Sequence, residues 1–113
     1  MTVVWKEPKR RRQGERMRMM DRKRHLLETA IPLAEKHGFE HVSRGMVALE
    51  AGVAPSLLSS YWTAPDFQTA LMEEAIAREN LVLVAQGLTA RHPAALAAPI
   101  TLRWMAVKHL IEE

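Results

Sequence analysis

The sequence lacks cysteine altogether and has no long apolar run. Without cysteine, the 113 residues can form neither a disulfide nor a thiolate metal site, which fits a reducing cytoplasm. No apolar stretch approaches the roughly 18 residues that a membrane-spanning helix needs. The first residues place their apolar side chains before their charges, which is the reverse of a secretion signal. These absences predict a small cytoplasmic protein that has no membrane partner.

The signatures of an active site are also absent. The chain has no glycine-rich phosphate loop and no nucleophile motif. Glu73 and Glu74 are adjacent, so on a helix they point in different directions and cannot act as an acid–base pair. His37 and His41 have the spacing of zinc ligands, but Gly38 separates them at a predicted helix end and no third ligand is near. We therefore expect no enzyme activity, no metal and no cofactor.

What the chain does have is an uneven distribution of charge. Residues 1–24 contain ten Lys or Arg and three Asp or Glu, which gives +7, whereas residues 25–113 contain six and ten, which gives −4. A basic arm on an acidic body indicates a polyanionic partner, either nucleic acid or, less often, an anionic membrane. The alternative is a solubilising tail. We predict a flexible basic arm over residues 1–14.

The spacing of the apolar residues predicts an all-α protein of about five helices. Met17, Met20 and Leu27 begin a stripe at three- and four-residue steps, which predicts a helix from about residue 15 to Gly38. Pro32 lies inside this helix and is expected to kink or split it. Four more helices are expected over residues 44–51, 56–62, 65–87 and 94–112, the last of them interrupted near Pro99.

The second and third predicted helices have the layout of a helix-turn-helix. Ser43 is suited to cap the first of them, and Gly52 permits the positive φ that the turn needs. Ala48 and Ala51 are small enough for the two helices to cross closely. In such a unit the second helix lies in the major groove of DNA. The alternative is that the small residues only allow tight packing.

A longer stretch, residues 26–62, supports the DNA-binding interpretation. It reads LLETAIPLAEKHGFEHVSRGMVALEAGVAPSLLSSYW and resembles the DNA-binding domain of TetR-family transcriptional repressors. The resemblance lies in the Glu-x-x-Gly-Phe segment, the Ala-Gly-Val turn and the aromatic residue Trp62. It implies an N-terminal helix-turn-helix domain of three helices over residues 15–64. The C-terminal helices of residues 65–113, two in number, would then form the dimer.

The sequence departs from the family in ways that bear on function. Pro65 stands where the family commonly has a lysine that binds a phosphate group, and Ser59 stands where it commonly has a tyrosine. The family also has a larger C-terminal domain with an effector pocket, whereas about 50 residues follow the motif here. So short a segment has little room for a pocket of several hundred Å³. We therefore expect no small-molecule inducer.

The expected DNA contacts lie on the exposed face of the second helix and at the start of the first. Serine hydroxyls can bond to base edges, Leu57 can meet a thymine methyl group, and the resemblance gives Tyr61 a phosphate contact. The full set of expected contacts outside the arm is Ser43, Arg44, Pro55, Ser56, Leu57, Ser59, Ser60 and Tyr61.

Because the second helix is uncharged, the affinity for DNA has to come from elsewhere. The candidates are ten basic residues: Lys6, Lys9, Arg10, Arg11, Arg12, Arg16, Arg18, Arg22, Lys23 and Arg24. Arms of this kind can enter the minor groove beside a helix that reads the major groove. Deletion of residues 1–14 is predicted to weaken binding to every sequence and to lower its salt dependence.

The C-terminal residues are too apolar for the surface of a monomer. The segment from Leu81 to Val84 is apolar nearly all round a helix, and the residues after Leu102 spread over more than one face. We therefore predict a homodimer whose interface includes Leu81, Val84, Leu102, Trp104, Met105 and Leu110. The alternative is that these side chains pack within one chain.

Together, these features predict a sequence-specific DNA-binding repressor that acts as a homodimer on a palindromic operator, with double-stranded DNA and a second copy as its partners. Two other classes remain open. One is a helical interaction adaptor whose helix-turn-helix has lost DNA binding. The other is a protein that binds nucleic acid without sequence preference through its arm.

Overall fold

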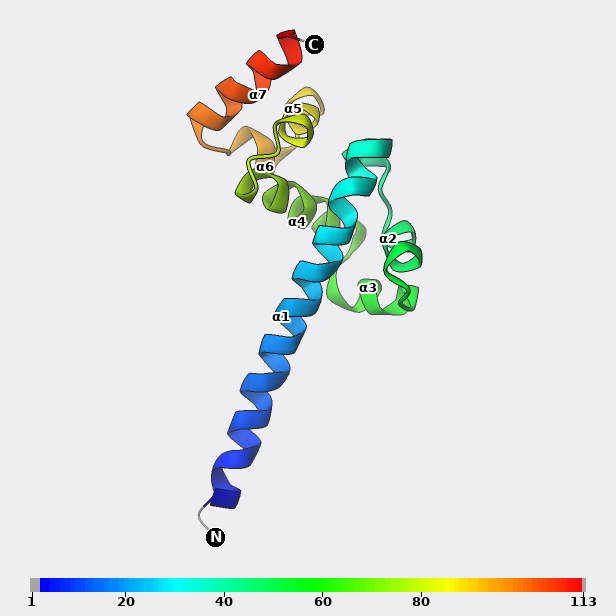
Figure 1. Ribbon diagram of the computed structural model, residues 1–113, viewed down its shortest axis with the longest axis vertical. Coiled ribbons are helices and arrows are strands. Elements are labelled where there is room, and N and C mark those ends of the chain that lie inside the picture. Colours follow the sequence, from blue (N-terminus) through cyan, green and yellow to red (C-terminus); the bar gives the residue numbers. More distant parts are fainter. Residues whose placement is uncertain (1–2, 113) are drawn as a thin grey trace.

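The computed structural model describes the backbone of residues 3–112 and the side chains of residues 18–112. Every regular element in the described backbone is helical (Figure 1). The elements are α1 (Val3–His37), the 3₁₀ turn η1 (Phe39–His41), α2 (Arg44–Ala51), α3 (Pro55–Tyr61), α4 (Ala64–Ala77), α5 (Leu81–Thr89), α6 (Pro93–Leu96) and α7 (Ile100–Glu112). The protein is therefore all-α. None of these helices combines the length and the apolar character that crossing a membrane requires.

The longest helix, α1, extends well beyond the rest of the molecule. Figure 1 shows its amino-terminal half projecting alone, while its carboxyl-terminal half packs among α2, α3 and α4. The prediction that this helix begins near residue 15 is wrong, because α1 starts at Val3 and includes most of the expected flexible arm. The segment is rich in Arg, Lys, Glu and Met, which are strong helix formers, and this composition offsets Pro8 and Gly14.

Pro32 does not split α1. Its ring lies on the exposed side of the helix, and the helix continues through it to His37. Leu26 and Ala30 precede the proline and Ala34 follows it, and all three are at most 1% exposed. Because the core anchors the helix on both sides of Pro32, the loss of one backbone hydrogen bond does not break it.

The main core lies where α1 meets α2, α3 and α4. Phe39, Val47, Leu58, Phe67 and Leu71 are almost fully buried there, together with the inward stripe of α1. That stripe begins only at Leu26. Met20, which the apolar spacing places on it, is 61% exposed, and the side chain of Met17 lies outside the described part of the chain.

The connection between α2 and α3 has the predicted local geometry. The Ser43 hydroxyl accepts a hydrogen bond from the Met46 N–H at 3.1 Å and so caps α2. Gly52 ends that helix in the left-handed conformation, with φ 71°. The N–H of Val53 then donates to the carbonyl of Ala48 at 3.0 Å, which closes the turn. These predictions for α2 and its turn are confirmed.

After α3 the chain forms four helices, α4 to α7, where the sequence predicted two. The expected helix over residues 65–87 is broken between α4 and α5, where Glu79 has a φ of 54°. Asn80 caps the start of α5, because its side chain accepts a hydrogen bond from the Leu83 N–H at 3.1 Å. The predicted interruption near Pro99 is confirmed, since it separates α6 from α7.

A second, smaller core joins α5 to α7, which lie against one another at the carboxyl-terminal end of the molecule (Figure 1). It contains five buried residues: Val84, Ala85, Ala98, Leu102 and Ala106. Gly87 lies on the other side of α5, where α4 and α6 approach so closely that a Cβ atom would come within 2.7 Å of the Ala95 Cβ. Helix α5 therefore packs against α7 on one side and against α4 and α6 on the other.

Polar contacts tie α1 to the start of the carboxyl-terminal helices. Arg78 lies 3.4 Å from Glu28 of α1 and 2.6 Å from Glu74, and its hydrogen bond to Glu74 raises the pKa of its guanidinium. The Asn80 amide donates to Glu35 at 3.1 Å. The Phe39 backbone N–H donates to the Gln86 side chain at 2.9 Å. These contacts link α1 and η1 to the end of α4 and to α5.

Candidate nucleic-acid interface

The outward face of α3 is polar and carries no charge. Leu58 is fully buried and anchors the helix, whereas Pro55, Ser56 and Ser59 are exposed. The Ser60 side chain is also exposed, but its hydroxyl donates to the Leu57 carbonyl at 2.6 Å, so only its oxygen lone pairs remain for a further partner. The face therefore offers hydroxyl groups that can bond to base edges but cannot neutralise phosphates.

Two other expected contacts on α3 are half-buried. Leu57 packs partly against the main core, which leaves a smaller apolar surface than a fully exposed leucine would offer. The Tyr61 ring lies edge to face with Trp62, with their centroids 5.7 Å apart. The Lys23 ammonium group of α1 lies 5.5 Å from the Tyr61 ring centroid and 5.7 Å from that of Trp62. These contacts hold the Tyr61 ring at the end of α3 against α1.

The structure gives Arg44 an internal partner that the sequence did not predict. Its Nη1 donates to the Trp62 carbonyl at 2.9 Å, which links the start of α2 to the end of α3. Ser43 is exposed, and its hydroxyl serves as the cap of α2. Arg44 was expected to contact DNA, which stays a prediction; the hydrogen bond adds a role in positioning α3.

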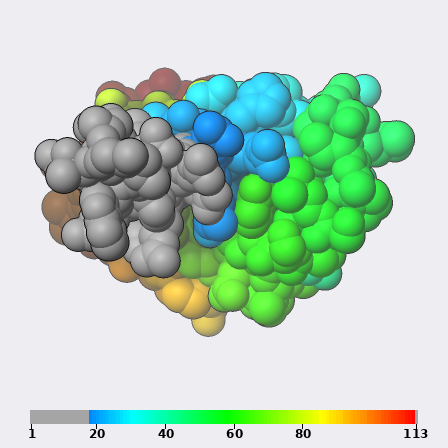
Figure 2. All heavy atoms as spheres, turned by 90° about the horizontal axis from the view of Figure 1, so that it is seen from below, coloured from blue at the N-terminus to red at the C-terminus, as the bar shows by residue number. Residues whose placement is uncertain are grey.

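The first described turns of α1 are basic, and Figure 2, which views the molecule from the amino-terminal end of α1, shows them (blue) beside the segment that includes α3 (green). Arg18, Met19 and Arg22 line a hollow of about 230 Å³ together with Tyr61. Sequence reasoning named Arg18 and Arg22 only as members of a basic arm. Their spacing of four residues was the signal that both lie on one face of a helix.

The four basic residues at the centre of the predicted arm, Lys9 to Arg12, have side chains outside the described part of the chain, as do Lys6 and Arg16. Their backbone continues α1. At a rise of 1.5 Å per residue, residues 9–12 lie about 15–20 Å along the axis from Arg22. A helix with its side chains is about 10–12 Å across, so it does not fit the roughly 6 Å width of the minor groove.

The expected dimer-interface residues divide into two groups. Val84 is fully buried and Leu102 is 4% exposed, because they pack on one another inside the subunit. Val84 and Leu102 are therefore core residues of a single chain and not interface residues. For these two side chains, the alternative of packing within one chain is correct. Leu81 is half-buried. The other three, Trp104, Met105 and Leu110, are 68%, 47% and 52% exposed.

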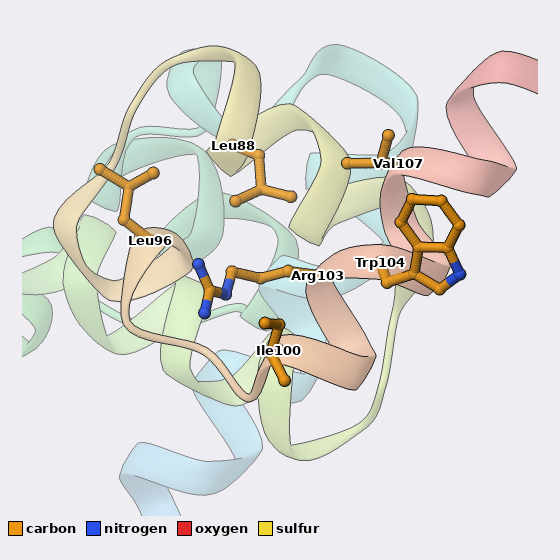
Figure 3. A pocket seen from close by; sticks show the side chains of 6 residues that line it. All are labelled: Leu88, Leu96, Ile100, Arg103, Trp104 and Val107. Atoms are coloured by element: carbon orange, nitrogen blue, oxygen red, sulfur yellow. The ribbon is translucent and has the colours of Figure 1, made fainter.

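Of these three, Trp104 borders an apolar groove between α5, α6 and α7, whereas Met105 lies beside Leu81 in a different hollow. The groove has a volume of about 340 Å³ and is lined by Leu88, Leu96, Ile100, Arg103, Trp104 and Val107. Leu88 belongs to α5, Leu96 to α6 and the other four to α7, and Figure 3 shows how these side chains lie around the groove. The Arg103 side chain is partly held, because its Nε donates to the Ala98 carbonyl at 2.9 Å. Apart from Arg103, the side chains that line the groove are apolar.

Within the described residues, no group of three His, Asp or Glu side chains is arranged to hold a metal ion. Comparison with protein-family models, with curated proteins and with solved structures gave no match for the chain.

Proposed function

We propose that the chain is a sequence-specific DNA-binding repressor that acts as a homodimer on a palindromic operator. The observation that carries the proposal is the juxtaposition of an uncharged face, with Ser56 and Ser59 exposed on α3, and the cationic turns of α1. The two surfaces have complementary roles, because base edges are read by hydrogen bonds and phosphates are bound by charge.

In this proposal α3 lies in the major groove, which is about 12 Å wide and admits a helix. Helix α2 braces it through the turn at Gly52 and through the hydrogen bond from Arg44 to the Trp62 carbonyl. Ser56 and Ser59 then face the base edges. Because a helical arm is too wide for the minor groove, α1 follows the phosphate backbone instead of entering that groove.

The exposed apolar residues of α7 support the homodimer. Ile100, Trp104 and Ile111 are each more than two-thirds exposed, which is costly for large apolar side chains that stay in water. Pairing two copies through this face would bury them and would place two α3 helices on one duplex. Two-fold pairing implies a palindromic site whose half-sites lie about one helical turn apart. A bound dimer would repress transcription by blocking access of the polymerase to the promoter.

The groove beside α7 bears on regulation. Its volume of about 340 Å³ is at the lower end of the range for small-molecule sites. We assign its apolar lining to the dimer contact, so that repression is controlled by the amount of protein or by a partner protein. A small-molecule inducer is not part of the proposal.

Selection of bound duplexes from a pool of random sequence tests the proposal. The expected result is one enriched palindromic sequence that binds more tightly than a scrambled duplex of the same length. The double change Ser56→Ala and Ser59→Ala should reduce this preference, whereas Thr101→Ala, an exposed hydroxyl on α7, should leave it unchanged.

Two results would contradict the proposal. Equal binding to the selected and scrambled duplexes would favour a protein that binds nucleic acid without sequence preference. No binding to either duplex at low salt would favour a helical interaction adaptor. The observation in favour of that alternative is the exposed apolar face of α7, which is a surface suited to a partner protein.

A further inference from the structure

We propose that Arg18 and Arg22 of α1, together with Tyr61 of α3, form a binding site for one phosphodiester group of the DNA backbone. The proposal rests on the proposed function and deepens it, because it assigns the phosphate contact to a particular place on the molecule. That place is the junction between the projecting helix and the helix that faces the bases.

The shape of the junction is the first argument. Arg18 and Arg22 are four residues apart on α1, so their side chains share one face of the helix. Both line the same hollow as Tyr61, whose helix is far from α1 in the sequence. A phosphate group in this hollow would contact α1 and α3 at once, and it would fix the position of α3 relative to the DNA strand.

The charge of the junction is the second argument. Within residues 18–112, the ion pairs are formed by Arg78 and Lys108, so no described carboxylate neutralises either arginine. Residues 18–24 contain four basic side chains and one acidic side chain. Residues 55–65, which include all of α3, contain no basic side chain. A phosphate beside α3 must therefore be bound by cations from another element, and α1 supplies them.

The chemistry of the three side chains is the third argument. A guanidinium group binds a phosphate through two parallel hydrogen bonds and keeps its charge at all physiological pH values. The phenol of Tyr61 can donate a third hydrogen bond. Its ring is already held by Trp62 and by the Lys23 ammonium group, so little freedom is lost on binding.

The test measures affinity against salt concentration for the full chain on the selected duplex and on a scrambled duplex. Loss of one phosphate contact should lower the salt slope by about 0.9. Arg22→Gln and Arg18→Gln should each lower the slope by up to this amount and weaken both duplexes equally. Tyr61→Phe should weaken binding several-fold at an unchanged slope, because the lost group is neutral. The matched control is Lys36→Gln, which removes one charge from an exposed position at the other end of α1.

The outcomes separate this site from the proposed function. If the wild-type chain binds DNA and the two arginine variants behave like Lys36→Gln, the phosphate site is wrong and the repressor stands. If the wild-type chain binds no duplex but binds vesicles that contain an anionic lipid, both the site and the repressor are wrong. If the salt slope falls for Arg18→Gln and Arg22→Gln but not for Lys36→Gln, the result supports the phosphate site.

Discussion

At the scale of single residues, Gly87 shows how closely the helices approach one another. A Cβ at this position would lie 2.6 Å from Met72 Cε and 2.7 Å from the Cβ of Ala95. Although alanine favours a helix by about 1 kcal/mol over glycine, overpacking costs about 1–3 kcal/mol. We expect Gly87→Ala to lower the free energy of unfolding, measured with denaturant at one protein concentration. Gly45→Ala is the control, because only Ser43 Oγ lies near, at 3.8 Å, and it should be neutral or stabilising.

Arg44 provides a second test at this scale, because its hydrogen bond inside the protein suggests a role in stability beside the predicted contact with DNA. Its hydrogen bond to the Trp62 carbonyl predicts that Arg44→Ala lowers the free energy of unfolding by about 1 kcal/mol. If Arg44 instead acts mainly on DNA, the variant will keep its stability and the salt slope of binding will fall by about 0.9. Denaturant unfolding and a salt titration of the same variant distinguish the two roles.

At the scale of elements, α1 persists through a proline that would ordinarily end it. Pro32 removes the hydrogen bond to the Glu28 carbonyl, while buried residues on both sides keep the helix in place. Pro32→Ala should therefore restore one backbone bond and raise the free energy of unfolding by about 1–3 kcal/mol. Denaturant unfolding checks the value, and a destabilised variant would contradict the account of how α1 is held.

Local signals account for the elements that the sequence predicted well. Ser43 caps α2 and Gly52 takes a positive φ because each depends on its immediate neighbours along the chain. The break between α4 and α5 was missed, although Asn80 is a good cap before an apolar run. The apolar spacing continues across Glu79, and nothing in its side chain indicates a positive φ.

Burial was harder to predict than secondary structure, because it depends on which helices meet. Met20 continues the apolar stripe of α1 but lies beyond the point where other helices cover it. Val84 and Leu102 have the character of interface residues, yet they face one another within a single chain. For the candidate site, the sequence identified the exposed serines of α3 but not the meeting of Arg18 and Arg22 with Tyr61.

At the scale of the whole molecule, the exposed apolar face of α7 predicts the oligomeric state. Trp104 is 68% exposed beside the groove, and it should be central to a homodimer contact. Trp104→Glu is expected to shift a dimer toward the monomer in sedimentation experiments. Leu49→Glu is the control, because Leu49 is 85% exposed on α2, away from α7. A wild-type chain that is monomeric at all concentrations would rule out the homodimer.

The central claim is that an uncharged helix selects the DNA site while the basic amino-terminal helix supplies the affinity. The most direct test compares the salt dependence of binding for the full chain and for a chain without residues 1–14. The account predicts that the deletion weakens the selected and scrambled duplexes by the same factor and lowers the slope by about 0.9 for each lost phosphate contact. An unchanged slope, or a loss confined to the selected duplex, would contradict it.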